Sequence, residues 1–381
     1  MSEPGRFLPY GRQLIDDADV AAVTEVLASD FLTTGPEVAR FEAALCEVTG
    51  ARHAVAVSSG TAALHCAYFA AGLGPGDEIV TSPLTFAATA NAALYLGAEV
   101  RFADVAEDSG NLDPAAAEGA ITPRTRMIVA IDYAGHPADY EALAEVASRR
   151  GLTLVADAAH SLGGSYHGRP VGTLAPLSTT SFHPVKPVTT SEGGAVLTDD
   201  EAAAARARRF RNHGIEPASD GAPESWKYAM QDLGFNYRLP DLLCALGRSQ
   251  LGKLDRFLAR RRALAERYSE ELADLDELLL PEERSGVRSG WHLYVVRVSA
   301  GAEARRALYL RLREMGLGVQ VHYLPVYLHP YYRRLGFRPG LCPVAERRAS
   351  TSLSLPLYPA LTDADVDSVV DRVRRAVRGL G

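Results

Sequence analysis

The chain has 381 residues, a length that suggests two domains or one large domain with a smaller appendage. An apolar share of 47% and a charged share of 23% are typical of a soluble globular protein, and a net charge of −7 argues against nucleic acid or an anionic membrane as main partner. No apolar run could span a bilayer, the N-terminus carries no signal segment, and the cysteines lack metal-ligand spacing (Cys46, Cys66, Cys244, Cys342). We therefore expect a cytoplasmic protein with neither a metal site nor a disulfide framework.

Helix-like and strand-like patterns alternate through the first 200 residues. Helices are predicted over 16–28 (with Asp16 or Asp17 as the N-cap), 38–48, 62–71, 86–96 and 140–149. Strands are predicted over 53–58, 78–82, 100–104, 127–132, 152–157, 179–182 and 194–198. This alternation predicts an α/β fold with a mostly parallel central sheet and helices on both faces, whose ligand binds beyond the carboxyl ends of the strands.

The remainder of the chain predicts a smaller α+β domain. A long basic amphipathic helix is predicted over 239–272, and an edge or antiparallel strand over 291–298. A helix over 304–315, a strand over 319–323 and a helix over 363–377 follow. Since no low-complexity linker separates the parts, we expect a large domain over 1–250 joined by helix to a small domain over 251–381.

A single lysine and a single acid carry the strongest chemical signal. Lys186 lies in a proline-bounded, almost chargeless loop within SFHPVKPVTTSEGGAV, which begins at Ser181, and Asp157 ends an apolar strand. The alternatives are a solvated lysine and an acid that caps a turn. Together, however, the two residues suit an enzyme that holds pyridoxal phosphate (PLP), because the amine can bond to the cofactor aldehyde and the acid can keep the pyridine nitrogen protonated.

Other residues near predicted strand ends fit the same cofactor. Gly60 and Thr61 open a helix, where backbone N–H groups bind phosphate, although an ordinary N-cap is equally compatible. Ala159 is small enough to lie flat against a ring. Phe86 is either a stacking aromatic or plain core, and His160 is either a partner of the phenolic oxygen or a satisfied loop histidine.

Two further segments have a less specific signal. Asn236, in GFNYR, could contact a phosphate, but the sequence alone favours a helix cap. The segment from His322 to Arg333 is dense in tyrosine and histidine, which suits either a bulky polar ligand or a subunit interface.

Taken together, these motifs resemble the DegT/DnrJ/EryC1/StrS family of sugar aminotransferases, which have the fold-type I architecture. The resemblance runs from Tyr10 to Tyr358, and its most specific pieces are DFLTTGPEVARFE, SSGTAALH, VADAAHSLGG, SFHPVKPVTTSEGGAV and GFNYRLPD.

The resemblance implies a role for each matched residue. Lys186 would be the catalytic residue that bonds to PLP and moves protons, and Asp157 would pair with the pyridine nitrogen. The remaining implied cofactor contacts are Phe86 and Ala159 on the two ring faces, His160 at the phenolic oxygen, Gly60, Thr61 and Ser181 at the phosphate, and Asn236 at the phosphate of the partner subunit in a homodimer with shared sites. Implied contacts of the sugar are Thr33, His183, His322 and Tyr323.

Within the family, the wording of DFLTTGP, GVQVHYLPVYLHPYY and LSLPLYP most resembles transaminases of pseudaminic acid biosynthesis. Those enzymes make UDP-4-amino-4,6-dideoxy-N-acetyl-β-L-altrosamine from the nucleotide-linked 4-keto sugar, with L-glutamate as amino donor. The chain departs from the common family pattern at Ser59, His136 and Pro187. The departures at His136 and Pro187 leave the sugar open, so amination of another nucleotide-linked keto sugar at C3 or C4 is an alternative. A PLP-dependent sugar dehydratase would carry histidine in place of Lys186, and a non-catalytic regulator would not need the pair of Lys186 and Asp157.

Overall fold

The computed structural model describes residues 6–217 and 226–378. It contains a seven-stranded sheet in the order β2-β10-β9-β6-β5-β3-β4. Its strands are β2 (His53–Val57), β3 (Glu78–Thr81), β4 (Glu99–Phe102), β5 (Thr125–Ile131), β6 (Thr153–Asp157), β9 (Leu177–Ser181) and β10 (Gly194–Thr198). β10 is antiparallel to β2 and β9, and the other neighbours in the order are parallel.

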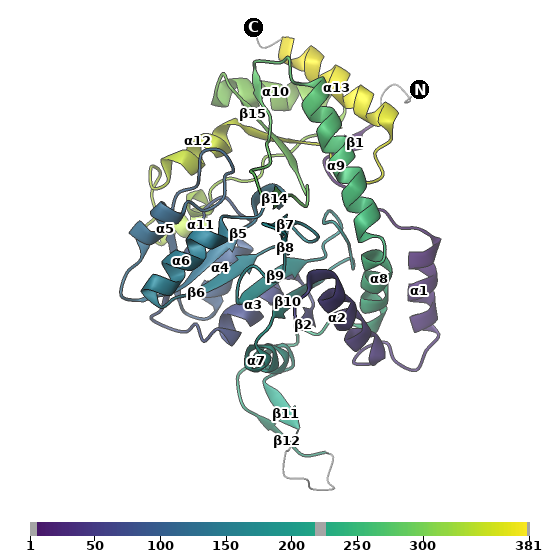
Figure 1. Cartoon of the computed structure of the whole chain (residues 1–381), viewed down its shortest axis with the longest axis vertical. Helices are drawn as coiled ribbons and strands as arrows, with labels where there is room; N and C mark the ends of the chain where they lie inside the picture. The colour runs from purple at the N-terminus through teal and green to yellow at the C-terminus, as the bar shows by residue number, and fades with distance from the viewer. Residues whose placement is uncertain (1–5, 218–225, 379–381) are drawn as a thin grey trace.

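Helices cover both faces of this sheet (Figure 1). Both faces are apolar because successive side chains of a strand point to opposite faces. In β2, Val55 and Val57 enter one apolar core, whereas Ala54 and Ala56 enter another. The first core also holds side chains of α3 (Gly60–Ala70), α4 (Ala88–Tyr95) and α7 (Glu201–Arg211). The opposite face is covered by α2 (Pro36–Thr49), α5 (Pro114–Ala120), α6 (Tyr140–Arg150) and α8 (Asp241–Leu251), with α1 (Asp17–Leu27) packed on α8. The predicted α/β fold with a mainly parallel sheet is therefore confirmed.

The C-terminal part builds a separate apolar core around a three-stranded sheet of β13 (Leu278–Leu279), β15 (Tyr294–Val298) and β17 (Ser352–Leu355). Side chains of α9 (Leu254–Glu271), α10 (Ala302–Glu314) and α13 (Asp363–Arg378) complete it. β1 (Leu8–Pro9) pairs with β16 (Leu317–Gly318), and Leu8 is buried in the same core. The division into 1–250 and 251–381 stays a prediction.

Shorter elements connect these layers. They are η1 (Tyr133–Gly135), η2 (Val326–Leu328), α11 (Pro330–Arg334), α12 (Pro343–Thr351), a small sheet of β7 (Ser165–Tyr166), β8 (Arg169–Pro170) and β14 (Val287–Arg288), and a two-stranded ribbon of β11 (Ile215–Pro217) and β12 (Tyr228–Met230). None of the helices within 6–217 and 226–378 has both the length and the apolar character needed to cross a membrane.

Most predicted elements are present, but three in the C-terminal half are wrong in extent. The helix predicted over 239–272 is two helices, α8 and α9, which meet at Gly252 and Lys253. At this break the Lys253 ammonium forms ion pairs with Asp16 and, at 2.8 Å, with Asp19 of α1. Glycine also has a low helix propensity, so the break costs little.

The strand predicted over 291–298 begins only at Tyr294, because Trp291 has a φ of +43°, which an extended strand does not allow. β15 lies between β13 and β17 and is antiparallel to both, so it is antiparallel as predicted but not an edge. The strand predicted over 319–323 is irregular apart from a bridge between Gln320 and Ser354, and only Leu317–Gly318 forms a strand.

Candidate active site at the carboxyl edge of the sheet

The sheet register brings several predicted site residues to one edge. Ser181, the last residue of β9, pairs with Gly194, the first of β10, and Gly194 also pairs with Val57 at the end of β2. Asp157 ends β6 and pairs with Thr179 of β9. Because carboxyl ends of parallel strands share one edge, the loop that carries Lys186 between β9 and β10 begins beside Asp157.

The start of α3 lies directly against Ser181. The Ser59 hydroxyl accepts a hydrogen bond from the Ala62 N–H at 3.1 Å and so caps the helix. A Cβ added to Gly60 would lie 2.9 Å from Ser181 Cβ, and one added to Gly194 would lie 2.5 Å from the Ser59 carbonyl oxygen. Glycine at these two positions therefore permits close approach of the helix N-terminus to β9 and β10, a geometry that suits a phosphate.

Asp157 is buried and held by two donors. Its Oδ2 accepts a 2.7 Å hydrogen bond from the Thr89 hydroxyl, and its Oδ1 accepts a 3.3 Å bond from the Ala159 N–H. Burial raises the pKa of Asp157, while the Thr89 bond and the charge of Lys186 oppose that shift. Sequence reasoning missed Thr89, since a threonine inside a predicted helix gives no sign that it faces a strand end.

Lys186 is half-buried. Burial lowers its pKa to about 8, and the negative charge of Asp157 partly opposes this shift. Throughout the part of the chain that the structure describes, its ammonium forms neither a hydrogen bond nor an ion pair. The uncharged, nucleophilic form of the amine is consequently far more populated near neutral pH than in an exposed lysine.

A cluster of neutral histidines lies near Lys186. The His160 Nε2 lies 3.2 Å from the Tyr323 hydroxyl, while its Nδ1 is buried without a hydrogen-bond partner. The ring centroid of His160 lies 4.3 Å from that of His292, and His322 Nδ1 contacts the Ser354 hydroxyl at 2.8 Å. Burial lowers the pKa of all three imidazoles, and the charge of Lys186 adds to the effect.

Four of the other predicted residues are exposed. Phe86 is 64% exposed and precedes α4, which begins at Ala88, so the helix predicted from residue 86 starts two residues later. Thr33, His183 and Asn236 are exposed as well. The helix-cap alternative for Asn236 is wrong, because the N-cap of α8 is Pro240 and Asn236 instead forms a bridge with Asn212.

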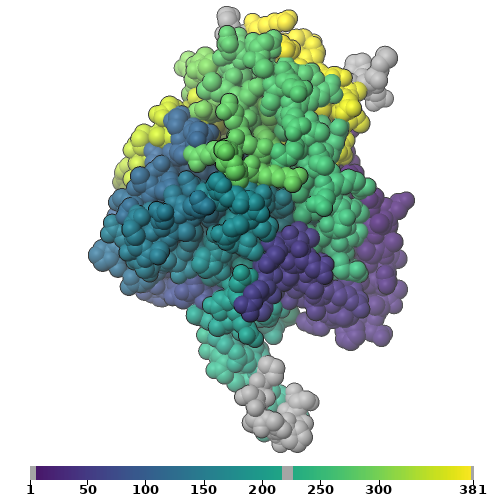
Figure 2. Space-filling view, viewed as in Figure 1, coloured from purple at the N-terminus to yellow at the C-terminus, as the bar shows by residue number. Residues whose placement is uncertain are grey.

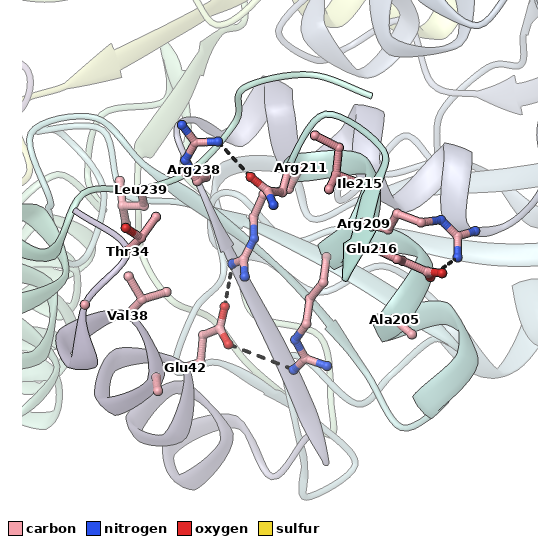
Figure 3. Close-up of a pocket in the computed structure, with 14 residues that line it drawn as sticks. Thr34, Val38, Glu42, Ala205, Arg209, Arg211, Ile215, Glu216, Arg238 and Leu239 are labelled. Carbon is pink, nitrogen blue, oxygen red and sulfur yellow. Dashed lines mark hydrogen bonds and ion pairs between the residues drawn. The ribbon is translucent and has the colours of Figure 1, made fainter. Parts of the chain in front are cut away.

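A cavity also lies outside the group of residues described above. It has a volume of about 590 Å³, lies between α2 and α7, and is lined by Arg208, Arg209, Arg211 and Arg238 (Figure 3). Glu42 pairs with Arg211 at 2.6 Å, Glu216 pairs with Arg209 at 2.5 Å, and Arg238 donates to Asn212 at 2.7 Å. Neither Lys186 nor Asp157 lines this cavity, and the sequence analysis did not anticipate it.

The chain matches the DegT/DnrJ/EryC1/StrS aminotransferase family over residues 13–374. It belongs to this family. A curated relative, the spore coat polysaccharide biosynthesis protein SpsC of Bacillus subtilis, is 40% identical over 380 residues, which cover 98% of each chain.

Solved structures agree with the sequence match. PseC of Helicobacter pylori, an aminotransferase involved in pseudoaminic acid biosynthesis, superposes with a TM-score of 0.92 at 31% identity and covers 98% of this chain and 100% of its own. Spr1654 of Streptococcus pneumoniae in its PLP form gives 0.93 at 27% identity, with the same coverage. The protein is thus a PLP-dependent sugar aminotransferase of the fold-type I class, and its cofactor is PLP.

The residues present at the carboxyl edge fit this cofactor. The unpaired Lys186 amine, the buried carboxylate of Asp157 and the unpartnered Nδ1 of His160 provide a nucleophile, an anion and a free ring nitrogen. The backbone N–H groups at the N-terminus of α3, which lies beside Ser181, can bind a phosphate.

Proposed function

We propose that this enzyme aminates C4 of a nucleotide-linked 4-keto-6-deoxy sugar with L-glutamate as amino donor, and that its product is UDP-4-amino-4,6-dideoxy-N-acetyl-β-L-altrosamine. The observation that carries this proposal is the near-complete superposition on PseC at 31% identity. A match at this identity over nearly the whole length supports a substrate related to that of PseC. The fold alone does not fix the substrate, because function resides in the site.

A second candidate is the amination of a different nucleotide-linked keto sugar, at C3 or C4. The 40% identity to SpsC, whose name assigns it to spore coat polysaccharide biosynthesis, favours this candidate. A sugar dehydratase is disfavoured because Lys186 is present where those enzymes carry histidine.

We assign the chemistry at the carboxyl edge to a few side chains. PLP, when bound, supplies an electron sink for the carbanion that forms at the amino-acid α-carbon. Lys186 would hold the cofactor through its aldehyde, and the Lys186 amine would take the α-proton of glutamate and later return a proton to C4 of the sugar. Asp157 would keep the pyridine nitrogen protonated, and the buried hydrogen bond from Thr89 holds the Asp157 carboxylate in place.

The remaining contacts orient the ring and its phosphate. Phe86 and Ala159 would lie against the two ring faces, and His160, whose Nδ1 is buried without a partner, would bond to the phenolic oxygen. Gly60, Thr61 and Ser181 would hold the phosphate. For the sugar we propose contacts with Thr33, His183, His322 and Tyr323, of which Tyr323 already bonds to His160.

We further propose a homodimer in which Asn236 reaches the phosphate in the partner's site. The ribbon of β11 and β12 projects from the body of the chain (Figures 1 and 2). Large apolar side chains on and beside it are exposed: Trp226 by 73%, Tyr228 by 66%, Met230 by 65% and Leu233 by 81%. Apolar surface of this kind is typical of an interface, and a second copy of the chain offers a self-complementary one.

Purified enzyme incubated with L-glutamate and a panel of nucleotide-linked 3-keto and 4-keto sugars tests the substrate. We expect 2-oxoglutarate to form with the UDP-linked 4-keto-6-deoxy N-acetyl sugar, and NMR of the product to show an amino group at C4. Turnover confined to a 3-keto sugar, or to a different nucleotide, would overturn the first candidate in favour of the second.

The Lys186 assignment has its own test. Borohydride reduction of the holoenzyme should add the mass of reduced cofactor to the peptide that contains Lys186, and Lys186→Ala should lose both the adduct and turnover. Proton transfer by a positioned amine contributes roughly 10²–10⁴-fold, so turnover of Lys186→Ala near the wild-type rate would refute the assignment.

A further inference from the structure

Arg261 of α9 occupies a position where an apolar residue is expected. Leu254, Phe257, Leu264 and Tyr268 follow helical spacing on the same face, and all are buried. The first two pack in the core that also holds Phe182 and Val188 of the lysine loop, and the last two pack in the C-terminal core. Arg261 lies between the two cores and is itself completely buried.

Its guanidinium donates to main-chain carbonyl oxygens only. Nη1 lies 3.2 Å from the Trp291 oxygen, 3.3 Å from the His292 oxygen and 3.0 Å from the Leu357 oxygen. Nη2 lies 3.5 Å from the Val185 oxygen, and Nε is buried without a partner. Within residues 6–217 and 226–378, no carboxylate forms an ion pair with this cation.

Such an arrangement is costly for folding. Burial lowers the pKa of Arg261 to about 10, yet the side chain is still charged near neutral pH. An ion taken out of water without a counter-ion destabilises the folded state, and an apolar residue of similar volume would pack there at lower cost. We therefore look for the role of this charged side chain in the backbone segments that its guanidinium joins.

Two of those segments border the active site. Val185 immediately precedes Lys186, and His292 packs its ring against His160. Leu357 follows β17 of the C-terminal sheet, and its N–H donates to the Tyr10 carbonyl oxygen. One planar group thus joins the lysine loop, the segment behind His160 and the C-terminal part of the chain.

We propose that Arg261 is a positioning residue for transamination: it holds the backbone of Val185 and His292 so that the Lys186 amine and the His160 ring keep a fixed mutual geometry. This inference rests on the proposed role of Lys186. Displacement of a reacting group by about 1 Å can lower a rate by about 10²-fold, so a modest shift of the loop should be visible in turnover.

Two substitutions, with a matched control, test the proposal. Arg261→Lys keeps the cation but loses the planar set of donors, and Arg261→Met keeps the volume without the charge. Arg260→Met, one position earlier on the same helix, removes bonds to Leu361 and Asp363 that lie away from the lysine loop. Folding is checked by circular dichroism, and hydrogen exchange is measured on the cofactor-free proteins.

We expect faster amide exchange over 183–190 and 289–293 in both Arg261 variants, with little change in α3. For Arg261→Lys we expect kcat to fall at least about tenfold, the KM for glutamate to change less than about threefold, and the isotope effect with α-deuterated glutamate to rise, because proton transfer becomes slower. Arg260→Met should match the wild type in all of these measurements.

A folded Arg261→Lys protein with wild-type kcat, isotope effect and exchange over 183–190 would overturn the proposal. So would exchange that rises only within α9, since that result indicates a purely structural role. Failure of the Lys186 assignment is recognised separately, because borohydride-treated wild-type protein would then carry no adduct on the Lys186 peptide.

Discussion

The hydroxyl of Thr89 lies 2.7 Å from Oδ2 of Asp157 and donates a hydrogen bond to it. This contact joins α4 to the end of β6, and both residues are buried. The same hydroxyl lies 2.8 Å from that of Thr85, from which it can accept, and the Thr89 backbone N–H donates to the Phe86 carbonyl oxygen at 3.3 Å. The residue proposed to stack on the cofactor and the residue proposed to pair with its nitrogen therefore share one polar anchor.

Thr89→Val should weaken cofactor binding and turnover together. A hydrogen bond to a charged group contributes roughly 1.5–3 kcal/mol, so we expect about a tenfold or larger rise in the PLP dissociation constant. Absorbance titration of the cofactor-free protein measures it. Thr85→Val is the control, because Thr85 bonds to Thr89 but not to Asp157. Equal PLP affinity in the Thr89 variant and the wild type would contradict the anchor role.

Gly60→Ala should push α3 away from Ser181. The added Cβ would lie 2.9 Å from Ser181 Cβ, closer than side-chain carbons normally approach, so the phosphate contacts proposed there should loosen. We expect PLP affinity to fall about tenfold or more, while alanine itself suits a helix. Gly74→Ala serves as the control, since no atom lies within 4 Å of its added Cβ. Unchanged PLP affinity in Gly60→Ala would count against a phosphate site between α3 and Ser181.

The reactivity of Lys186 should depend on pH in a shifted range. Burial lowers its pKa from 10.5 to about 8, so the amine loses its proton, and gains reactivity, as pH rises through about 8. Amine-directed acylation of the cofactor-free protein, followed by peptide mass analysis, should show that midpoint. Asp157 opposes the shift, so Asp157→Asn should move the midpoint lower. A midpoint near that of an exposed lysine, or an upward shift in Asp157→Asn, would be the contrary result.

Mixed dimers test whether Asn236 acts in the partner's site. Lys186→Ala and Asn236→Ala are each expected to impair turnover. If both residues serve one site from different chains, a heterodimer of the two variants has one intact site, so random mixing should recover about a quarter of the wild-type sites. The mixture is assayed after dissociation and reassociation. Activity no higher than the average of the two parent proteins would mean that Asn236 serves its own chain.

Sequence patterns predicted the central sheet well, because most of its strands are short, largely apolar runs. Asp157 was recognisable for the same reason, since a polar residue that ends an apolar run is conspicuous. Ser181 instead ends a strand rich in serine and threonine, and its proposed role came from the family resemblance. The local pattern also located Lys186, because few other charges surround it in its loop.

Residues whose role depends on tertiary contacts were not recognisable. Thr89 lies on a helix and Arg261 on a basic amphipathic helix, where each is an ordinary residue by local pattern. Trp291 adopts a positive φ that its alternating neighbours did not indicate. The cavity lined by arginines is assembled from α2, α7 and residues 208–216 and 238–239, so no single stretch of sequence could reveal it.

The antiparallel return of β10 has a consequence for how this chain could be re-engineered. Ser181 and Gly194 are paired neighbours, so the intervening segment leaves and re-enters the sheet at adjacent points without a crossover helix. Its exposed positions can change while both anchoring strands keep their register, whereas Phe182 and Val188 are buried against α9. Transplanting residues 182–193 from a relative with a different sugar would therefore succeed only if the transplanted segment keeps side chains that pack against α9.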